Sequence, residues 1–464
     1  MVTLTKGLMR RQPTTRLQIS GHRFLMRRTA HALVRGDARM LDDPLAAQSI
    51  SLVIGAVLAV VAVAVAAVPA FLRPAGDLGD APIMLVRDSG ALYVRIDDRV
   101  HPVFNLASAR LIIGSPAEPR IVSQQAVDRA LRGPMVGVPG APPHVAPPVA
   151  DGRWTVCDDA RSELTTVIAG AAPRDLTEGR SVLVTARGEP AAPTYLLYGA
   201  WRARVDLRHP AVVRALRLDG LVPQPVSPLL LAAIPEAPAI VPPHIPSGRS
   251  ALPGMAAGTV LRVPGATPAS DELFVVLAGG VQRVGQVAAD LIRYTDARAA
   301  REIPAVGADR IGALPVVDSL PVTTFPQRAG VSADPVVCAR WDADAEPHTA
   351  LLTGAEPAAG HTSLPLAQAD GGGPALDAVA IPAGHGSYVR SVGLSGDAHQ
   401  AGPTFLVSDA GVRYGVPDAD AAAALGLPDP PVPAPWPVLA ALPAGPDLSR
   451  AAASVARDGV AASP

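Results

Sequence analysis

The sequence is almost free of lysine and poor in aromatic residues. Lys6 is the one lysine among 40 basic residues, so no lysine after residue 6 can act as a phosphate-binding, Schiff-base or Ser-Lys dyad residue. Aromatic residues make up 3% of the 464 residues, although 49% are hydrophobic. Any core must therefore be built from valine, leucine, isoleucine and alanine.

Motifs of the common catalytic and nucleotide sites are also missing. The patterns G-x-x-x-x-G-K-[ST], H-E-x-x-H and G-x-S-x-G do not occur. The glycine-rich PAGHGSYV (382–389) follows no βαβ pattern, and ALPVVD (313–318) has a proline inside its apolar run. The ten histidines show no ligand spacing, so we expect no metal, no cofactor and no catalytic residue. A Ser-His-Asp triad formed by residues that are distant in sequence is the alternative.

Net charge is close to zero but is split along the chain. The formal charge of −1 gives no overall case for nucleic-acid binding. Residues 1–43 carry nine basic and three acidic side chains, whereas the chain after Arg73 carries 30 basic and 38 acidic ones. The N-terminal segment is therefore a basic arm on an otherwise acidic chain.

A long uncharged run occupies residues 44–72, and its apolar portion is ISLVIGAVLAVVAVAVAAVPAFL (50–72). At about 1.5 Å per residue this portion spans about 34 Å, enough for a hydrocarbon core of about 30 Å. A signal peptide has an apolar region of roughly 7–15 residues near its start. The pattern favours a retained transmembrane helix over 44–73, rather than a cleaved signal or a buried helix of a soluble protein.

The positive-inside rule then sets the orientation of this single-pass protein in the inner membrane. The basic arm lies in the cytoplasm and residues 74–464 lie in the periplasm. Arginines in the arm recur at helical spacing, which predicts an amphipathic helix on anionic lipid. A plain topology signal and contact with a partner subunit are the alternatives. The residues of this basic stripe are Arg23, Arg27, Arg28, Arg35 and Arg39.

The two cysteines, Cys157 and Cys338, both fall in the predicted periplasmic region. An even pair in an oxidising compartment favours a disulfide over two free thiols. The loop between them is long, so such a bridge would contribute up to about 5 kcal/mol in the chain-entropy model.

Four segments share a pattern of strand, tight turn, strand and short helix. Apolar residues alternate, meet Gly or Asp at the turn, and then give way to a helical stripe. The segments are 91–112, 194–216, 272–292 and 404–425. Chance similarity is the alternative, since any α+β protein yields such pieces, and the irregular spacing excludes a tandem solenoid. We predict an α+β fold.

Several blocks resemble the EccB family, a single-pass component of the type VII (ESX) secretion complex of actinobacteria. The N-terminal block TTRLQISGHRFLMRRTAHALVRGDARMLDDP precedes the apolar run, and WTVCDD and VVCARW contain the cysteines. Further similar blocks are NLASARLIIGSP, RGPMVGVPGAP, IPAGHGSYVRSVG and VPAPWPVLAALPAGPDLS. His385 stands where the family's glycine-rich turn has arginine. The resemblance covers nearly the whole chain.

The resemblance implies an elongated periplasmic domain with four ββα-type repeats around a central β-rich core, joined by a Cys157–Cys338 bridge. It implies a structural role in the export machine, with EccC, EccD and EccE as partner subunits, the mycosin protease nearby, and further copies of the chain itself. Some family members carry an ATPase label, so an ATPase is the alternative function. An envelope-polymer binding module is a weaker one.

These observations together divide the chain into nine segments. They are the basic arm (1–43), the transmembrane helix (44–73), repeat 1 (74–149), the first core segment (150–190), repeat 2 (191–250), repeat 3 (251–312), the second core segment (313–400), repeat 4 (401–427) and a Pro-rich C-terminal strap and tail (428–464).

Overall fold

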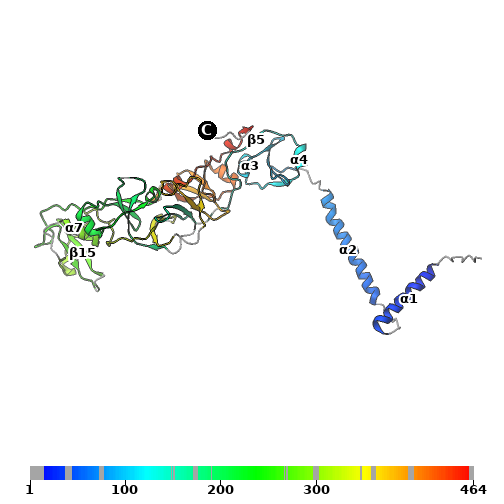
Figure 1. Ribbon diagram of the computed structural model, residues 1–464, viewed down its shortest axis with the longest axis horizontal. Coiled ribbons are helices and arrows are strands. Elements are labelled where there is room, and N and C mark those ends of the chain that lie inside the picture. Colours follow the sequence, from blue (N-terminus) through cyan, green and yellow to red (C-terminus); the bar gives the residue numbers. More distant parts are fainter. Residues whose placement is uncertain are drawn as a thin grey trace, which may run out of the picture. The chain divides into compact units, whose positions relative to one another are not determined.

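The computed structural model contains two compact units, Met1–Asp77 and Leu78–Pro464 (Figure 1). The structure describes residues 15–36, 44–72, 78–147, 149, 152–170, 176–189, 191–265, 267, 270–295, 302–344, 347–356, 362–395 and 402–458.

The first unit holds two helices, α1 (Arg16–Arg35) and α2 (Pro44–Leu72). The Thr15 backbone N–H donates to Gln18 Oε1 at 3.0 Å at the start of α1, and Gly36 ends it in the left-handed conformation. Side chains of α2 are described for residues 50–65. Within the described residues, no helix combines the length and the apolar character needed to cross a membrane. The transmembrane span therefore remains a prediction.

The second unit is built around a seven-stranded central sheet. Its strands come from two separate stretches of chain and run in the order β19-β20-β7-β6-β17-β18-β8. The strands are β6 (Trp154–Asp159), β7 (Thr165–Ala169), β8 (Thr177–Glu178), β17 (Val336–Asp342), β18 (His348–Gly354), β19 (Leu364–Pro365) and β20 (Ala378–Ala380).

Four smaller sheets, which we call modules 1 to 4, flank the central sheet. Module 1 (83–136) contains β1 (Ile83–Val86), β2 (Leu92–Ile96), β3 (Arg99–Pro102), α3 (Leu106–Ile113), β4 (Arg120–Val122), α4 (Gln124–Arg129) and β5 (Met135–Val136). Module 2 (182–237) contains β9 (Val182–Ala186), β10 (Thr194–Tyr198), β11 (Trp201–Arg204), α5 (Pro210–Leu216), β12 (Gln224–Val226), α6 (Pro228–Ala232) and β13 (Glu236–Ala237).

The other two modules also begin with three strands and a helix. Module 3 (260–316) contains β14 (Val260–Val263), β15 (Glu272–Val276), β16 (Val281–Val284), α7 (Gln286–Thr295) and α8 (Ala308–Gly312). Module 4 (387–444) contains β21 (Ser387–Val392), β22 (Thr404–Val407), β23 (Arg413–Val416), α9 (Ala419–Leu425), β24 (Val432–Pro435) and α10 (Trp436–Ala441). The chain then forms α11 (Arg450–Ala453) and β25 (Ala456–Arg457), which pairs with β5.

Strand pairing is alike in the four modules. Three antiparallel strands are followed by a helix, and the chain then returns parallel to the first strand. This return is β4 beside β1, β12 beside β9 and β24 beside β21, while module 3 makes a single parallel bridge between Arg262 and Ala305. The strands of the central sheet and the helices of the modules together confirm the mixed α+β class predicted from the sequence.

Local sequence explains where the module helices begin and end. The Asn105 side chain accepts a hydrogen bond from the Ser108 N–H at the start of α3, and Asp418 accepts one from the Ala421 N–H at the start of α9. Gly114 and Gly426 close the same two helices at positive φ, which other residues rarely adopt.

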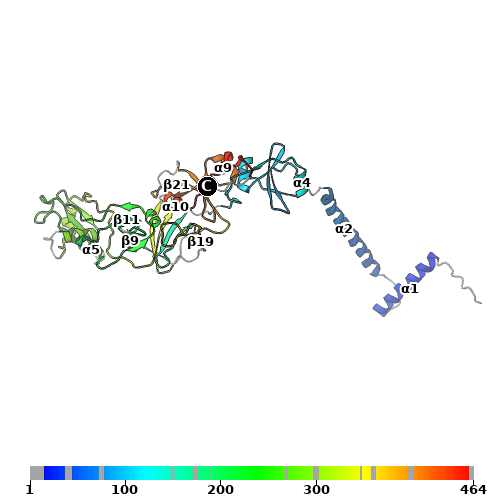
Figure 2. The ribbon, with the colours of Figure 1, turned by 45° about the horizontal axis from the view of Figure 1, so that its top comes forward.

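The hydrophobic cores show which modules pack together. One core joins the central sheet to modules 2 and 4, through residues such as Val156, Leu230 and Leu439. A second joins modules 2 and 3, and a third joins module 1 to module 4 and to the C-terminal segment. Figure 2 shows α9 beside module 1 and β9 and β11 beside α5. The first and last modules therefore share one core although they are distant in sequence.

Candidate functional site

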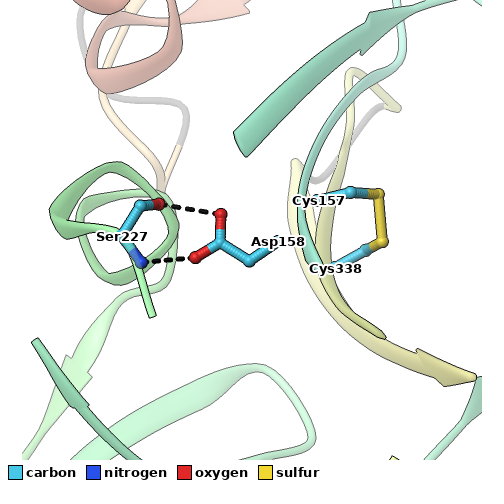
Figure 3. Close-up of a disulfide and its surroundings, with 4 residues drawn as sticks. All are labelled: Cys157, Asp158, Ser227 and Cys338. Atoms are coloured by element: carbon cyan, nitrogen blue, oxygen red, sulfur yellow. Dashed lines mark hydrogen bonds between the residues drawn. A yellow bond between two sulfur atoms is a disulfide. The ribbon is translucent and has the colours of Figure 1, made fainter. Parts of the chain in front are cut away.

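The centre of the second unit is a disulfide between β6 and β17. The two strands pair antiparallel, and their register places Cys157 directly opposite Cys338. Both cysteines are buried with Ile168, Val336 and Leu352 on one face of the sheet (Figure 3). The bridge joins two strands whose cysteines are 181 residues apart in sequence. It therefore fixes the two halves of the central sheet to each other.

The opposite face of β6 carries a buried carboxylate, Asp158. Its side chain points away from the disulfide toward the start of α6 (Figure 3). Ser227 Oγ donates to Asp158 Oδ1 at 2.9 Å, and the Ser227 backbone N–H donates to Oδ2. The guanidinium of Arg187, which follows β9, lies 3.8 Å from Oδ2. Burial raises the pKa of Asp158, while the Ser227 hydrogen bonds and the Arg187 charge oppose that rise.

Asp158 and Ser227 connect the central sheet to module 2. Ser227 is also the N-cap of α6, since its Oγ accepts a hydrogen bond from the Leu230 N–H at 3.1 Å. Leucines of α6 pack on Val156 and Val337 of the central sheet. The polar contact therefore sits inside an apolar joint, where it fixes the position of α6 on the sheet.

A second charged cluster lies at the other end of β17, around Asp342. Arg153 Nε lies 2.5 Å from Asp342 Oδ1, and Arg340 Nε lies 2.7 Å from Oδ2. Burial alone would raise the pKa of Asp342, but the hydrogen bonds from Arg153 and Arg340 outweigh it and lower the pKa below its ordinary value. The carboxylate is therefore ionised at neutral pH, and it holds both arginines beside the paired residues Trp154 and Trp341.

The junction of modules 1 and 4 is held by Arg110 of α3. Its Nη1 donates to the Leu425 carbonyl of α9 at 3.3 Å, and its Nη2 lies 2.6 Å from Glu118 Oε1. Arg457 Nε also donates to the Gly137 carbonyl at 3.3 Å, next to the β25–β5 pair. The C-terminal segment is therefore attached to the first module by both backbone and side-chain hydrogen bonds.

Modules 2 and 3 meet through their helices α5 and α7. The Arg214 guanidinium of α5 lies 5.0 Å from the centre of the Tyr294 ring of α7. The two module pairs, 1 with 4 and 2 with 3, thus each use the helix that follows the three-stranded meander.

The basic stripe predicted from the sequence lies on α1 for four of its five members. Arg23, Arg27, Arg28 and Arg35 are all exposed on this helix. Arg39 lies outside the described residues. Within the described portion of the chain, no group of three or more His, Cys, Asp or Glu residues is placed to hold a metal ion. Asp318, in the apolar run 313–318, accepts a hydrogen bond from Gln282.

Sequence reasoning did not find Asp158, Ser227 and Arg187. Asp158 and Ser227 are 69 residues apart, and no local pattern connects them. The one available signal was Ser227 followed by Pro228, which is typical of a helix start.

Comparison with known protein families gives one match over nearly the whole chain. Residues 11–462 match the family described as "Type VII secretion system ESX-1, transport TM domain B", EccB. The protein named "ESX-3 secretion system ATPase EccB3" of Mycolicibacterium smegmatis is 38% identical, covering 98% of this chain and 93% of that protein. The protein named "ESX-1 secretion system ATPase EccB1" of Mycobacterium tuberculosis is 32% identical, covering 97% and 96%.

Two solved structures have the same fold. A chain in the structure of an intact ESX-5 inner membrane complex is 31% identical, with a TM-score of 0.70, covering 99% of this chain and 98% of that one. A chain in the structure of the EccB3 dimer from the ESX-3 core complex is 36% identical, with a TM-score of 0.68, covering 81% of this chain and 100% of that one.

Proposed function

Because the chain belongs to the EccB family, we propose that it is the structural scaffold of the periplasmic side of a type VII export machine. The protein is a component of an ESX inner-membrane complex, as its solved relatives are. It assembles with other subunits of that complex and with further copies of itself.

The cross-linked central sheet is the observation that carries this proposal. One core joins the sheet to modules 2 and 4, which pack in turn on modules 3 and 1, and the disulfide ties the two halves of the sheet together. Such an arrangement presents several fixed surfaces on one rigid centre, which suits a protein that positions other subunits. The four modules are, in this proposal, copies of one ββα-type repeat around the core, since their strand order is alike.

The proposal also includes the membrane topology of the chain and its partner subunits. Residues 44–73 cross the inner membrane once, residues 1–43 lie in the cytoplasm and residues 74–464 lie in the periplasm. Support comes from the uncharged sequence of 44–72, which is continuous helix from Pro44 to Leu72, and from the basic residues before it. The partners are EccC, EccD and EccE, with the mycosin protease nearby.

Purification from membranes tests the scaffold role. We expect a tagged full-length chain, extracted in mild detergent, to bring down the other membrane subunits, identified by mass spectrometry. A tag on an unrelated single-pass protein of the same membrane is the matched control. A chain that purifies alone, under conditions that keep the other subunits together, would show that it does not belong to their framework.

The alternative function is ATP hydrolysis, because the names of several relatives contain the word ATPase. The sequence offers no P-loop and has no lysine after residue 6 to contact phosphates. We therefore expect the purified full-length chain to show no ATP turnover. Hydrolysis abolished by one substitution in this chain would favour the alternative.

We expect the four exposed arginines of α1 to hold this helix on the membrane surface or on a partner subunit. Replacing Arg23, Arg27, Arg28 and Arg35 with glutamine removes about 1 kcal/mol of lipid attraction per residue. The variant should stay in the membrane but recover several-fold less of the other subunits. A quadruple lysine variant keeps the charge and serves as the control.

The orientation of each α1 variant in the membrane is checked by protease protection, because arginine loss could also invert the topology. If the glutamine variant keeps its orientation and recovers the complex as well as the parent does, the basic stripe is only a topology signal.

A further inference from the structure

The four tryptophans of the chain have very different surroundings. Trp154 and Trp341 are each 2% exposed and pair across the central sheet. Trp436 is 43% exposed, but it stacks on Phe405, and the Arg413 guanidinium lies 5.4 Å from its ring centre. Trp201 is 38% exposed at the start of β11, and within the described residues its indole N–H has no hydrogen-bond partner. Trp201 is therefore the tryptophan available to a ligand.

Trp201 lines an open cleft of about 870 Å³, which is within the usual range for ligand sites. Three segments that are distant in sequence form its walls. They are residues 179–181 between the central sheet and module 2, residues 198–201 at the tip of the module 2 hairpin, and residues 323–332 between module 3 and the central sheet. The cleft thus lies where module 2 meets the chain that returns from module 3.

The side chains of this cleft are rich in hydrogen-bond donors and carry positive charge. Arg180 and Arg328 line it, and no aspartate or glutamate among the described residues does. Arg180 lies 3.1 Å from Asp334, which lies outside the cleft lining. Arg328 is exposed and makes no ion pair within the described portion of the chain. These groups suit a ligand with a carboxylate.

The backbone of the third wall suits an extended ligand. Residues 323–332 form no helix or strand, yet three hydrogen bonds attach them to more distant segments. Gln327 O accepts from the Gln286 N–H, the Gly330 N–H donates to Leu216 O, and the Ser332 N–H donates to Ser181 O. Between these contacts, the backbone N–H groups of 328, 329 and 331 have no partner among the described residues. A segment that is held in place and has unpaired N–H groups can donate hydrogen bonds to the main-chain carbonyls of a peptide.

From these observations we propose that the cleft around Trp201 and Arg328 binds an extended acidic peptide segment of another protein. Trp201 contacts an apolar side chain of the peptide, Arg328 binds its carboxylate, and the unpaired N–H groups of residues 328, 329 and 331 bind its carbonyl groups. The proposal rests on the cleft itself and does not depend on the scaffold role.

Fluorine NMR of the full-length chain, labelled with fluorotryptophan and held in detergent, tests this proposal. The four signals are assigned by single Trp→Phe substitutions. The probe is the peptide acetyl-Ala-Asp-Val-Glu-Ala-amide, and acetyl-Ala-Lys-Val-Lys-Ala-amide is its basic counterpart. We expect the acidic peptide to shift the Trp201 signal saturably at up to millimolar concentration and to leave the other three signals unchanged. The basic peptide should shift none.

Arg328→Ala should weaken binding of the acidic peptide about tenfold, because a charge-assisted hydrogen bond is lost. Arg249→Ala, which removes an exposed arginine that does not line the cleft, should leave the affinity unchanged. The unshifted signals of Trp154 and Trp341 report that each variant is folded. No shift of Trp201 with the acidic peptide, an equal shift with the basic one, or unchanged affinity in Arg328→Ala would each overturn the proposal. A shift with soluble anionic cell-wall fragments but not with the peptide would also overturn it, in favour of an envelope polymer.

Discussion

Replacing Cys157 and Cys338 together with alanine is expected to lower the free energy of unfolding by about 5 kcal/mol. The disulfide joins residues that are 181 positions apart, so its loss restores much conformational freedom to the unfolded chain. The folded state changes little, because β6 and β17 stay paired from Trp154 to Asp159 by backbone hydrogen bonds. Urea unfolding of the full-length chain in detergent, parent against double variant, measures the difference.

Reduction provides the control for this experiment. Dithiothreitol should lower the unfolding midpoint of the parent to that of the double variant, and it should leave the midpoint of the variant unchanged. A parent whose midpoint does not respond to reduction would show that the bridge contributes nothing to stability. An effect of reduction on the variant would point to a cause other than this disulfide.

Asp158→Ala should have the next largest effect, a loss of about 3 kcal/mol. The substitution leaves the Ser227 backbone N–H and the Arg187 guanidinium buried without the carboxylate that faces them. Ser227→Ala removes the hydroxyl that both donates to Asp158 and caps α6, which costs about 1–2 kcal/mol. The double variant should lose less than the sum, since the two residues contact each other.

The matched control for Asp158 is Asp219→Ala. Asp219 is exposed after α5, and within the described residues it makes no hydrogen bond or ion pair, so its loss should change stability by less than about 0.5 kcal/mol. If Asp158→Ala is as mild as this control, the buried joint does not fix module 2 on the central sheet.

The raised pKa of Asp158 also predicts a pH dependence. The folded protein holds this proton to a higher pH than the unfolded chain does, whose carboxyl titrates near its ordinary value of 3.8. This group's contribution to stability is therefore complete below pH of about 4 and falls as pH rises toward the folded pKa. Asp158→Asn removes that dependence. The stability difference between parent and Asp158→Asn should accordingly shift in favour of the variant as pH rises above about 4, as followed by urea unfolding.

The hairpins and helices of the modules follow from local signals in the sequence. Segment 91–112 alternates apolar residues up to Asp97 and Asp98 and then shows a helical stripe, and the structure has β2, β3 and α3 there. The strands that complete each module have no such signal. Met84 pairs with Arg120 across a three-residue strand, and that pairing depends on a helix between them placing the strand.

The last strand of module 4 could not be predicted from the sequence because its segment is rich in proline. Residues 428–446 have the composition of an extended strap, yet they contain β24 and α10. Pro433 and Pro435 are compatible with β24 because it is an edge strand, and Pro437 is compatible with α10 because it lies in the first turn. The buried contact between Asp158 and Ser227 could not be predicted either, because it depends on how module 2 packs on the central sheet and not on a local sequence pattern.

The shared core of modules 1 and 4 sets an order of events during biogenesis. Ile83, Val94 and Leu111 are buried with Tyr388, Leu425 and Leu448, so the first module completes its core only when the last residues are present. During synthesis from the N-terminus, module 1 must therefore wait, with one apolar face uncovered, until more than 300 further residues have followed. Modules 2 and 3 are neighbours in sequence and can pair at once. The protein should thus mature from its middle outward, and truncation near residue 448 should leave module 1, rather than the centre of the second unit, open to proteases.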